Sequence, residues 1–594
     1  MAKKKNAASN DKIISSLFFR LLPAQILLVG IPSLNGIISS LFAGNMLGKE
    51  AIAAIGMYAP IVSFITAVSN VFVSGSQILC GRYMGSSQVE RTQEIFSLNI
   101  VSVTVIALAA SVFMGAAGTL NLFSALNSDP AVMAVFNRYL IGCAIGFLPM
   151  MLGSQLSAFL SLELQGVRSS IATGLFVVTN LILTWLFLYV FRMQAFGLAL
   201  AASIGYWVYL AVEAAYYFSG KSLLKMKPAK FRTSDILEII LIGFPGAATM
   251  VYLAIRRIVL NGLVTKYAGI AGMSAFQAVD AFLSIFWAVP LGMAAVGRML
   301  MSVSYGEEDR HSLKDVLKTM LTKCLLIDCA VAAALIMLAV PFTRLYFRNV
   351  SEPVYMMTVS GFRLLPITMP LGLICQAWLN YGQVSKKQVF THSLAAVDGM
   401  ICPCLAMLAL VPLCGMNGVY YSLITNGIVT VIYPVIYAVV VNRGIPKSRD
   451  ELLMIPDSFG TSKEDRLDIS LTTDEEVVRI SKQVQDFCIR KGLDERRAYL
   501  SGLFLEEMAS NIVDHGFELD KKDHSVDVRV VYKNGDVILR LKDDCLPFNP
   551  QEFASIVDPE DVTKNIGVRM VYSMASDITY QNILGLNVLT IRIP

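Results

Sequence analysis

Long apolar segments fill most of the chain up to about residue 441. Twelve can be marked, at about 16–41, 53–80, 95–119, 136–163, 169–191, 195–218, 236–264, 271–300, 317–343, 355–382, 389–413 and 417–441. A helix needs roughly 20 apolar residues to cross a hydrocarbon core of about 30 Å, and these segments are long enough. The strict alternation of a membrane β-barrel does not occur in them. The pattern therefore predicts twelve transmembrane helices, because helices and closed barrels alone satisfy the backbone in lipid.

Lysine and arginine collect in every second connection between these segments, and the other connections hold far fewer of them. Short loops rich in these residues stay in the cytoplasm. An even number of spans then places both termini there, in a multi-pass protein of the plasma or inner membrane. The residues of the basic set are Lys3, Lys4, Lys5, Lys12, Arg82, Arg91, Arg168, Lys221, Lys225, Lys227, Lys230, Arg232, Arg310, Lys314, Lys386, Lys387 and Arg443.

The longest basic connection divides the spans into six and six. The string LQGVR at 164–168, after the fourth span, is echoed by YGQVSK at 381–386, after the tenth. Duplicated halves are typical of transporters, with the substrate path between them. The predicted organisation is a basic N-terminus (1–14), an N-lobe (15–220), a cytoplasmic linker (221–235), a C-lobe (236–441), a second linker (442–464) and a terminal domain (465–594).

The composition agrees with a chain of which one part lies in lipid and the other in water. Of its 594 residues, 55% are hydrophobic and 16% are charged, and the mean hydropathy is +0.60. Soluble domains carry about 25% charged residues. The ten cysteines fall mostly in apolar segments, and their spacing predicts neither a disulfide framework nor a zinc site. The charged residues concentrate after residue 457, where a water-soluble domain is expected.

Two short strings and one proline resemble features of the multidrug and toxic compound extrusion (MATE) family. They are LFAGNMLG at 41–48, GRYMG at 81–85 and the proline at Pro245, and the resemblance covers about residues 15–441. It implies a two-lobed, twelve-helix antiporter that exports amphipathic, often cationic, organic compounds in exchange for protons or sodium. Many members carry an aspartate in the first span where this chain has Ser39. A serine does not exchange protons near neutral pH, so this position departs from that N-lobe coupling.

Ionisable residues inside predicted spans are costly to bury and are therefore functional candidates. Asp280 and Asp398 lie in the eighth and eleventh spans, and Arg256 and Arg257 lie in the seventh. Burial raises the pKa of a carboxyl group, whereas a nearby arginine lowers it. Asp280 is thus either a carrier of the coupling ion or the partner of Arg257. By contrast, Glu213 and Asp328 look like helix-end or partner-helix charges.

The terminal domain is predicted to be an α/β sandwich with one helical layer on an antiparallel sheet. The hairpin turn is expected at Lys533-Asn534-Gly535, a favoured tight-turn sequence. The predicted elements are a strand at 468–472, helices at 474–491 and 494–515, hairpin strands at 525–532 and 535–541, a helix at about 567–574, and strands at 578–581 and 587–593.

The string EMASNIVDH at 507–515 places Glu507, Asn511 and His515 at four-residue intervals on one helix face. It resembles the N-box of the GHKL ATPase and kinase superfamily, most closely the anti-sigma-factor serine kinases. By this resemblance Asn511 holds Mg²⁺ and Glu507 is the catalytic base of a kinase. Oxygen ligands beside a nucleotide phosphate suit Mg²⁺. A polar stripe that merely covers the sheet edge is the other interpretation.

Two further strings resemble nucleotide boxes of this superfamily. DDCLPFNP at 543–550 is similar to its Asp-x-Gly-x-Pro-Phe box, which implies that Asp543 accepts a hydrogen bond from adenine. Cys545 replaces the usual glycine, which predicts weaker nucleotide binding. NIGVRM at 565–570 resembles the glycine box at a helix start, where phosphate binds. There Gly567 and Arg569 are the expected phosphate-binding residues.

Two function classes remain from the sequence. The first is an ion-driven exporter regulated by a cytoplasmic ATP-binding domain. The second is a membrane-tethered serine kinase or protein-binding switch, with the transporter half as its sensor. A primary ATP-driven pump is disfavoured because no G-x-x-x-x-G-K-[ST] string occurs. The expected partners are lipid, a small organic substrate, ATP with Mg²⁺, H⁺ or Na⁺, and a regulatory protein, but no nucleic acid.

Overall fold

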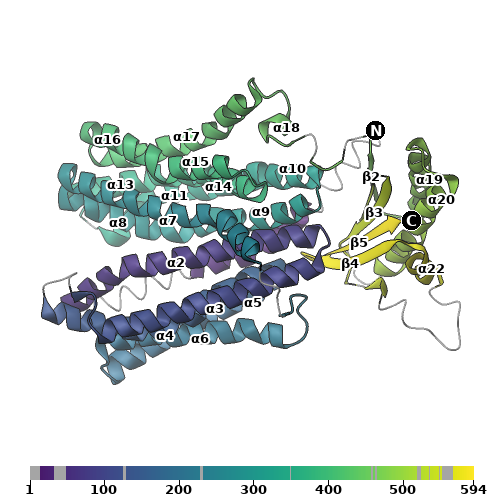
Figure 1. The fold of residues 1–594 in the computed structure, drawn as a ribbon. Helices are drawn as coiled ribbons and strands as arrows, with labels where there is room; N and C mark the ends of the chain where they lie inside the picture. The colour runs from purple at the N-terminus through teal and green to yellow at the C-terminus, as the bar shows by residue number, and fades with distance from the viewer. Residues whose placement is uncertain are drawn as a thin grey trace.

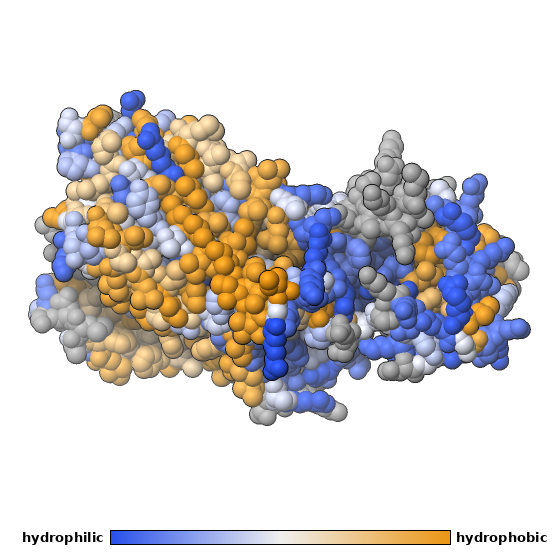
Figure 2. Space-filling view, turned by 90° about the horizontal axis from the view of Figure 1, so that it is seen from above, coloured by the Kyte–Doolittle hydropathy of each residue, from blue (hydrophilic) through white to orange (hydrophobic). Residues whose placement is uncertain are grey.

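The computed structural model describes residues 14–31, 48–124, 129–227, 232–347, 349–456, 459–461, 464–517, 524–533, 535–547, 549–551 and 566–594. It consists of a long helical bundle with an α/β domain at one end, called below the domain end of the bundle (Figure 1). Apolar surface covers much of the bundle, whereas the α/β domain presents a mostly polar surface (Figure 2). The twelve candidate spans found among the described residues confirm the predicted polytopic membrane fold.

The first six spans pack together as one lobe. Proline or glycine opens several of these helices, as expected for residues that start or end helices. The spans are the helix Ile14–Ile31, α2 (Gly48–Gly85), α3 (Val89–Thr119), α4 (Pro130–Leu162), α5 (Gly166–Trp185, continued by the π-helix Leu186–Val190) and α6 (Gln194–Phe218).

Most spans of the second lobe are built from two helices joined at a break. Breaks of this kind, above all π-helical turns, often mark functional sites. The elements are α7 (Thr233–Tyr267), α8 (Gly269–Phe286), α9 (Ala288–Gly306), α10 (Arg310–Thr319), α11 (Leu325–Met337), α12 (Ala339–Tyr346), α13 (Pro353–Leu364), α14 (Thr368–Val384), α15 (Gln388–Ala396), α16 (Cys402–Cys414) and α17 (Met416–Asn442), with π-helices at Met320–Cys324 and Val397–Ile401.

Glycines bring the two lobes into backbone contact near the domain end. A Cβ atom at Gly85 of α2 would lie 2.2 Å from the carbonyl oxygen of Val303 in α9. A Cβ atom at Gly243 of α7 would lie 1.9 Å from the carbonyl oxygen of Val71 in α2. Small residues allow such close packing between membrane helices. The last glycine of the GRYMG string at 81–85 therefore allows α2 and α9 to pack closely.

Arg82, which lies between Gly81 and Gly85 in α2, links the lobes by hydrogen bonds. Its Nε and Nη2 atoms donate to the carbonyl oxygen of Val384 at 3.1 and 2.6 Å, and Nη2 also donates to that of Gln383 at 2.9 Å. Both carbonyls lie at the C-terminal end of α14, where a helix leaves such groups without internal partners. The arginine thus closes the domain end of the bundle.

The α/β domain has one five-stranded antiparallel sheet of order β1-β2-β3-β5-β4. The helices lie on the face that points away from the bundle (Figure 1). This arrangement confirms the predicted sandwich. Its elements are β1 (Arg466–Leu471), α19 (Asp474–Arg490), α20 (Glu495–Asn511), the π-helix Ile512–Gly516, β2 (Val526–Lys533), β3 (Asp536–Asp543), α22 (Ile566–Met574), β4 (Asp577–Ile583) and β5 (Leu586–Ile593), with α18 (Arg449–Leu452) in the linker.

Alternation along the central strands explains how the sheet and helices join. Along β3, Val537, Leu539 and Leu541 are buried and their neighbours are not. Side chains of a strand point alternately to its two faces, so these residues form the core beneath α19 and α20. The hairpin pairs Lys533 with Asp536 as expected, and Asn534 in its turn lies outside the described residues.

Candidate functional site

The four charged candidates of the second lobe come from three elements, with both arginines on α7 and one carboxylate each on α8 and the π-helix Val397–Ile401. Arg257 of α7 forms an ion pair with Asp280 of α8, with Nη2 and Oδ2 2.8 Å apart. Arg256 interacts electrostatically with both Asp280 and Asp398. Of the two roles predicted for Asp280, the structure shows the ion pair with Arg257. The four groups comprise two positive and two negative charges, and the side chains of Arg257 and Asp280 are 61% and 41% exposed.

Asp398 is fixed at a break in its span. It belongs to the π-helix Val397–Ile401, between α15 and α16. The Nδ2 atom of Asn426 in α17 donates to its Oδ1 at 2.9 Å and to its backbone carbonyl at 3.2 Å. One amide thus supports both the widened turn and the carboxylate that faces Arg256. Asp398 is therefore held in place by groups that do not carry a charge, with one arginine nearby.

The first lobe contains a buried carboxylate that sequence reasoning undervalued. Glu213 of α6 is fully buried beside Ser157, Ser169 and Tyr209. It looked like a helix-end charge because it lies in the last turns of α6, yet its side chain points into the lobe. Asp328 in α11 is also fully buried. The tyrosine one turn before Glu213 was the available sequence signal. Ser39 lies outside the described residues.

In the α/β domain, Asp543 is fixed at the end of β3. Its Oδ1 atom accepts hydrogen bonds from the backbone N–H of Cys545 at 3.0 Å and from Nδ2 of Asn587 at 2.8 Å. Asn587 stands opposite Asp543 in the β3–β5 register. Burial raises the pKa of Asp543 above its usual range, and these hydrogen bonds partly oppose the rise. The carboxyl group is thus held in one orientation at the end of β3.

The other predicted nucleotide residues meet where α20 faces the start of α22. Glu507 lies so close to Gly567 that a Cβ atom there would be 1.8 Å from Oε2. Asn511 follows one turn later, and its Nδ2 atom donates to the carbonyl of Glu507. Arg569 is half-buried on α22, whereas His515 is exposed on the π-helix after α20. Asn565 and the rest of 552–565 lie outside the described residues.

These residues fit a nucleotide with Mg²⁺ in chemical type. Asn511 and Glu507 offer the hard oxygen atoms that Mg²⁺ prefers. Gly567 starts α22, and backbone N–H groups at a helix start bind phosphate. Cys545 differs from the glycine of the family box: a Cβ atom at Gly516 would lie 3.1 Å from its Sγ atom. The thiol therefore fills space between the end of the helix and the adenine box.

The α/β domain is joined to the second lobe by ion pairs that the sequence did not reveal. Three consecutive acidic residues in the turn between α9 and α10 each receive a basic residue from the β2–β3 hairpin. The pairs are Asp309 with Arg529 at 2.6 Å, Glu307 with Lys542 at 2.8 Å and Glu308 with Lys533 at 2.7 Å. The first two acids are buried and the third is exposed.

Asp309 is the central residue of this junction. Burial alone would raise its pKa, but the charges of Arg529 and Lys542 and hydrogen bonds from Ser312 hold it well below the usual range. Arg529 also contacts Asp468 of β1 at 2.7 Å. Burial disfavours its charge, yet the two carboxylates raise the pKa of Arg529 above its usual value. The pair is therefore charged throughout the physiological pH range.

The same domain contacts the first lobe through apolar residues. Ile583, Leu584 and Leu586, at the β4–β5 turn, are buried in the same apolar cluster as residues of the membrane helices. A Cβ atom at Gly585, which has φ of +73°, would lie 2.3 Å from Leu164 at the end of α4. The sheet thus touches both lobes at once.

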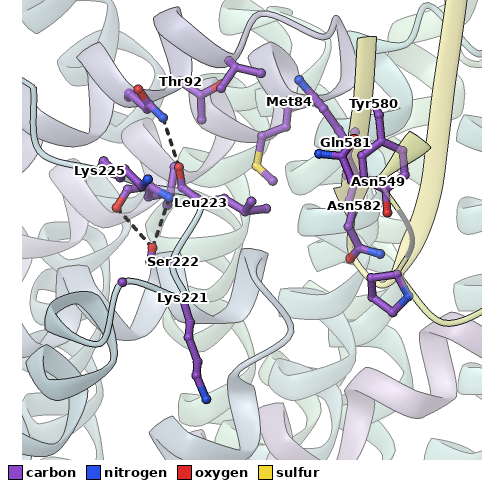
Figure 3. Close-up of a pocket in the computed structure, with 16 residues that line it drawn as sticks. Met84, Thr92, Lys221, Ser222, Leu223, Lys225, Asn549, Tyr580, Gln581 and Asn582 are labelled. Carbon is purple, nitrogen blue, oxygen red and sulfur yellow. Dashed lines mark hydrogen bonds between the residues drawn. The ribbon is translucent and has the colours of Figure 1, made fainter. Parts of the chain in front are cut away.

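A cavity of about 580 Å³ lies beside this apolar contact. Figure 3 shows Met84 and Thr92 on one side, Lys221 to Lys225 on another, and Asn549 with Tyr580 to Asn582 of the α/β domain opposite. The segment Lys221 to Lys225, between α6 and α7, is held by Gln93, whose Nε2 atom donates to the carbonyl of Leu223 at 3.1 Å. The volume is within the range of small-molecule sites.

Comparison with known proteins identifies both parts. Residues 27–186 match the MatE family model, and residues 471–593 match the model of the histidine kinase-like ATPase domain. The multidrug export protein MepA of Staphylococcus saprophyticus is 23% identical over 238 residues, which are 40% of this chain and 52% of that protein. The chain thus spans about half the length of this curated relative.

Solved structures show the fold of the membrane half. A crystal structure of MATE in complex with MaL6 has a TM-score of 0.67 at 18% identity, covering 70% of this chain and 94% of that one. An outward-facing multidrug resistance MATE transporter of the MOP superfamily has a TM-score of 0.66 at 17% identity, covering 73% and 97%. The membrane half therefore has the fold of MATE structures, and residues 27–186 and 471–593 match the two family models, which confirms both resemblances seen in the sequence.

Proposed function

We propose that the chain is a secondary antiporter that exports amphipathic organic cations in exchange for protons or sodium, under the control of its ATPase domain. The MATE fold and the similarity to a multidrug export protein support the class of transport. In the second lobe Phe282 packs against Phe286, Phe342 and the fully buried Phe362, and the partly exposed rings of this cluster are the proposed apolar contacts of the substrate. Faces of aromatic rings attract cations, which suits this substrate class.

Asp398 is the proposed carrier of the coupling ion. Asp280 forms an ion pair with Arg257. By contrast, Asp398 is held by the neutral amide of Asn426 and interacts electrostatically with Arg256. Loss of the Asp398 charge on binding H⁺ or Na⁺ changes the balance of the cluster, which leaves Arg256 free to reorganise. This change at the break between α15 and α16 is the proposed trigger that moves the second lobe. Asp280 and Arg257 position α7 against α8 during the cycle.

The ATPase domain is the proposed regulator because it contacts both lobes at the end where they meet. Alternating access requires the lobes to separate there. While the domain is docked on Glu307 to Asp309 and on Leu164, it opposes that separation. ATP with Mg²⁺ held by Asp543, Asn511, Glu507, Gly567 and Arg569 would supply a negatively charged ligand that ties α20 to α22. The basic connections lie at this same end, which supports its placement in the cytoplasm.

Efflux from vesicles tests the transport proposal. The purified chain in proteoliposomes should move ethidium, an amphipathic cation, when a proton or sodium gradient is imposed, and an uncoupler of that gradient should stop it. ATP without a gradient should not drive transport. Ethidium movement that depends on ATP and ignores both gradients would overturn the proposal.

Nucleotide binding tests the proposed regulator separately. Calorimetry on the full chain should detect binding of ATP with Mg²⁺, and Asn511→Ala should weaken it because the metal loses an oxygen ligand. Ser510→Ala is a matched control, since Ser510 contacts Asp474 on α19 rather than a nucleotide residue. No heat of binding at millimolar ATP would contradict the assignment.

A further inference from the structure

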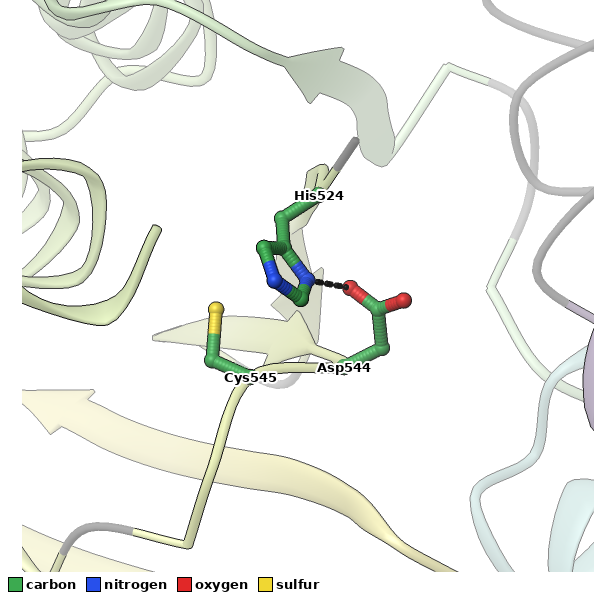
Figure 4. A group of neighbouring side chains, drawn as sticks. All are labelled: His524, Asp544 and Cys545. Atoms are coloured by element: carbon green, nitrogen blue, oxygen red, sulfur yellow. Dashed lines mark hydrogen bonds and ion pairs between the residues drawn. The ribbon is translucent and has the colours of Figure 1, made fainter. Parts of the chain in front are cut away.

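Three side chains with metal-binding atoms meet beside the nucleotide residues. His524 precedes β2, and Asp544 with Cys545 follows β3. Val526 pairs with Asp543 in the antiparallel register, so the start of β2 lies beside the end of β3. One ligand atom from each of the three residues lies within 4.8 Å of the other two. Figure 4 shows the three side chains turned toward one another.

The environment of this cluster is that of a prepared site. His524 and Cys545 are buried, while the Asp544 side chain is 36% exposed and leaves a path to solvent. Asp544 Oδ1 lies 2.9 Å from Nδ1 of His524, and the ring of Phe517 packs on the imidazole at 5.5 Å. Such contacts fix the orientation of a histidine ligand in advance.

The backbone that carries the thiol is fixed as well. The N–H group of Cys545 donates to Asp543, and its carbonyl accepts a hydrogen bond from Nδ2 of Asn587 at 3.2 Å. The thiol therefore keeps its position near the imidazole. Ligand atoms of a metal site need this kind of preorganisation.

We propose that His524, Asp544 and Cys545 bind a divalent metal ion of the zinc class at the edge of the nucleotide site. An imidazole nitrogen, a thiolate and a carboxylate oxygen are ligands that Zn²⁺ takes, and three protein ligands leave one position for water or another ligand. The thiol of Cys545 loses its proton to solvent when the metal binds, so binding tightens as pH rises. Sequence spacing does not reveal the site because its ligands come from the ends of two strands.

The proposed site gives a reason for the cysteine at position 545, where the family box has glycine. This cysteine places a sulfur atom two positions after Asp543, the predicted adenine residue. A bound metal would tie the loop after β3 to the start of β2. The ATPase domain would then respond to metal as well as to nucleotide. This inference does not depend on whether the domain hydrolyses ATP or regulates transport.

Cobalt spectroscopy on the full chain tests the proposal. With the affinity tag removed, Co²⁺ titrated into the detergent-solubilised protein should give the thiolate-to-cobalt charge-transfer absorption with one equivalent bound, and Zn²⁺ should abolish it. Cys545→Ser should lose the absorption. Cys488→Ser is the matched control, because Cys488 is a buried cysteine of the same domain on α19, and it should keep the absorption.

Two further variants show whether loss of the absorption comes from loss of a metal ligand or from misfolding. Cys545→Gly, which restores the residue of the family box, should also lose the absorption. His524→Gln should keep it only at higher cobalt, with affinity lower by at least about tenfold, since even residues that merely orient metal ligands have effects of about 10–100-fold. Absence of the absorption in the unmodified chain, or its persistence in both Cys545 variants, would overturn the proposal.

Discussion

The two lobes differ in the charged groups that they contain and in the residues that they present to the ATPase domain. The second lobe contains a balanced cluster of four charges and presents three acidic residues to the ATPase domain. The first lobe, within its described residues, buries the carboxylate of Glu213 among hydroxyl groups and presents an apolar contact at Leu164. The difference indicates a division of labour. In the proposed function, charge in the second lobe responds to ions, while the first lobe provides the apolar surface against which the domain docks.

Removal of the Asp398 charge should have the largest effect. We expect Asp398→Asn to reduce gradient-driven efflux to the background of empty vesicles, because the amide cannot exchange an ion near Arg256. Glu213→Gln is the matched change in the first lobe and should retain substantial efflux. The opposite ranking of the two variants would assign coupling to the first lobe and break the comparison.

Loss of the buried junction pair should come next. Asp309→Asn leaves Arg529 with Asp468 as its remaining carboxylate. We expect docking to weaken by about 3 kcal/mol, the lower end of the cost of breaking a buried pair. Hydrogen exchange at the β2 amides would report this change.

Glu308→Gln is the control for that variant. Its pair with Lys533 is exposed on both sides, and exposed pairs contribute about 0–1 kcal/mol. Equal exchange rates in the two variants would show that the buried pair does not hold the domain.

The apolar contact with the first lobe should contribute somewhat less. Leu584→Ala removes a side chain that is 2% exposed. We expect the free energy of docking to fall by about 2 kcal/mol, the low end for such a truncation, because a domain boundary can partly collapse around the space.

Salt should separate the two contacts. The apolar contact with the first lobe should be insensitive to salt, whereas salt should screen the exposed ion pairs with the second lobe. Equal salt dependence of docking in Leu584→Ala and Asp309→Asn would contradict this contrast.

A change of pH should have the smallest effect on docking. The pKa of Asp309 is depressed in the folded chain, so its contribution is complete above the ordinary carboxyl pKa of about 3.9 and is lost only as pH falls toward the folded value. Docking should therefore be constant between about pH 5 and 8. A steep loss of docking in that window, measured by hydrogen exchange, would show that the pair is not charged.

The sequence predicted the fold well because each part has a local signal. Hydropathy alone marks the spans, and the strings around Asn511, Asp543 and Gly567 mark the ATPase domain. The sites were harder, since their partners are distant in sequence. The sequence offered Arg257 as one possible partner of Asp280, and the fold of α7 against α8 brings the two together. The acidic run at Glu307 to Asp309 received no predicted role, because its partners lie in strands of another domain.

In the proposed function, the docked ATPase domain opposes separation of the lobes during ion-driven export. Proteoliposomes containing the unmodified chain or the double variant Asp309→Asn/Leu584→Ala, at equal protein density and without nucleotide, should export ethidium under the same imposed gradient. We predict a faster initial rate for the double variant because its lobes are released. An equal or slower rate, with the variant still folded and gradient-dependent, would contradict the account.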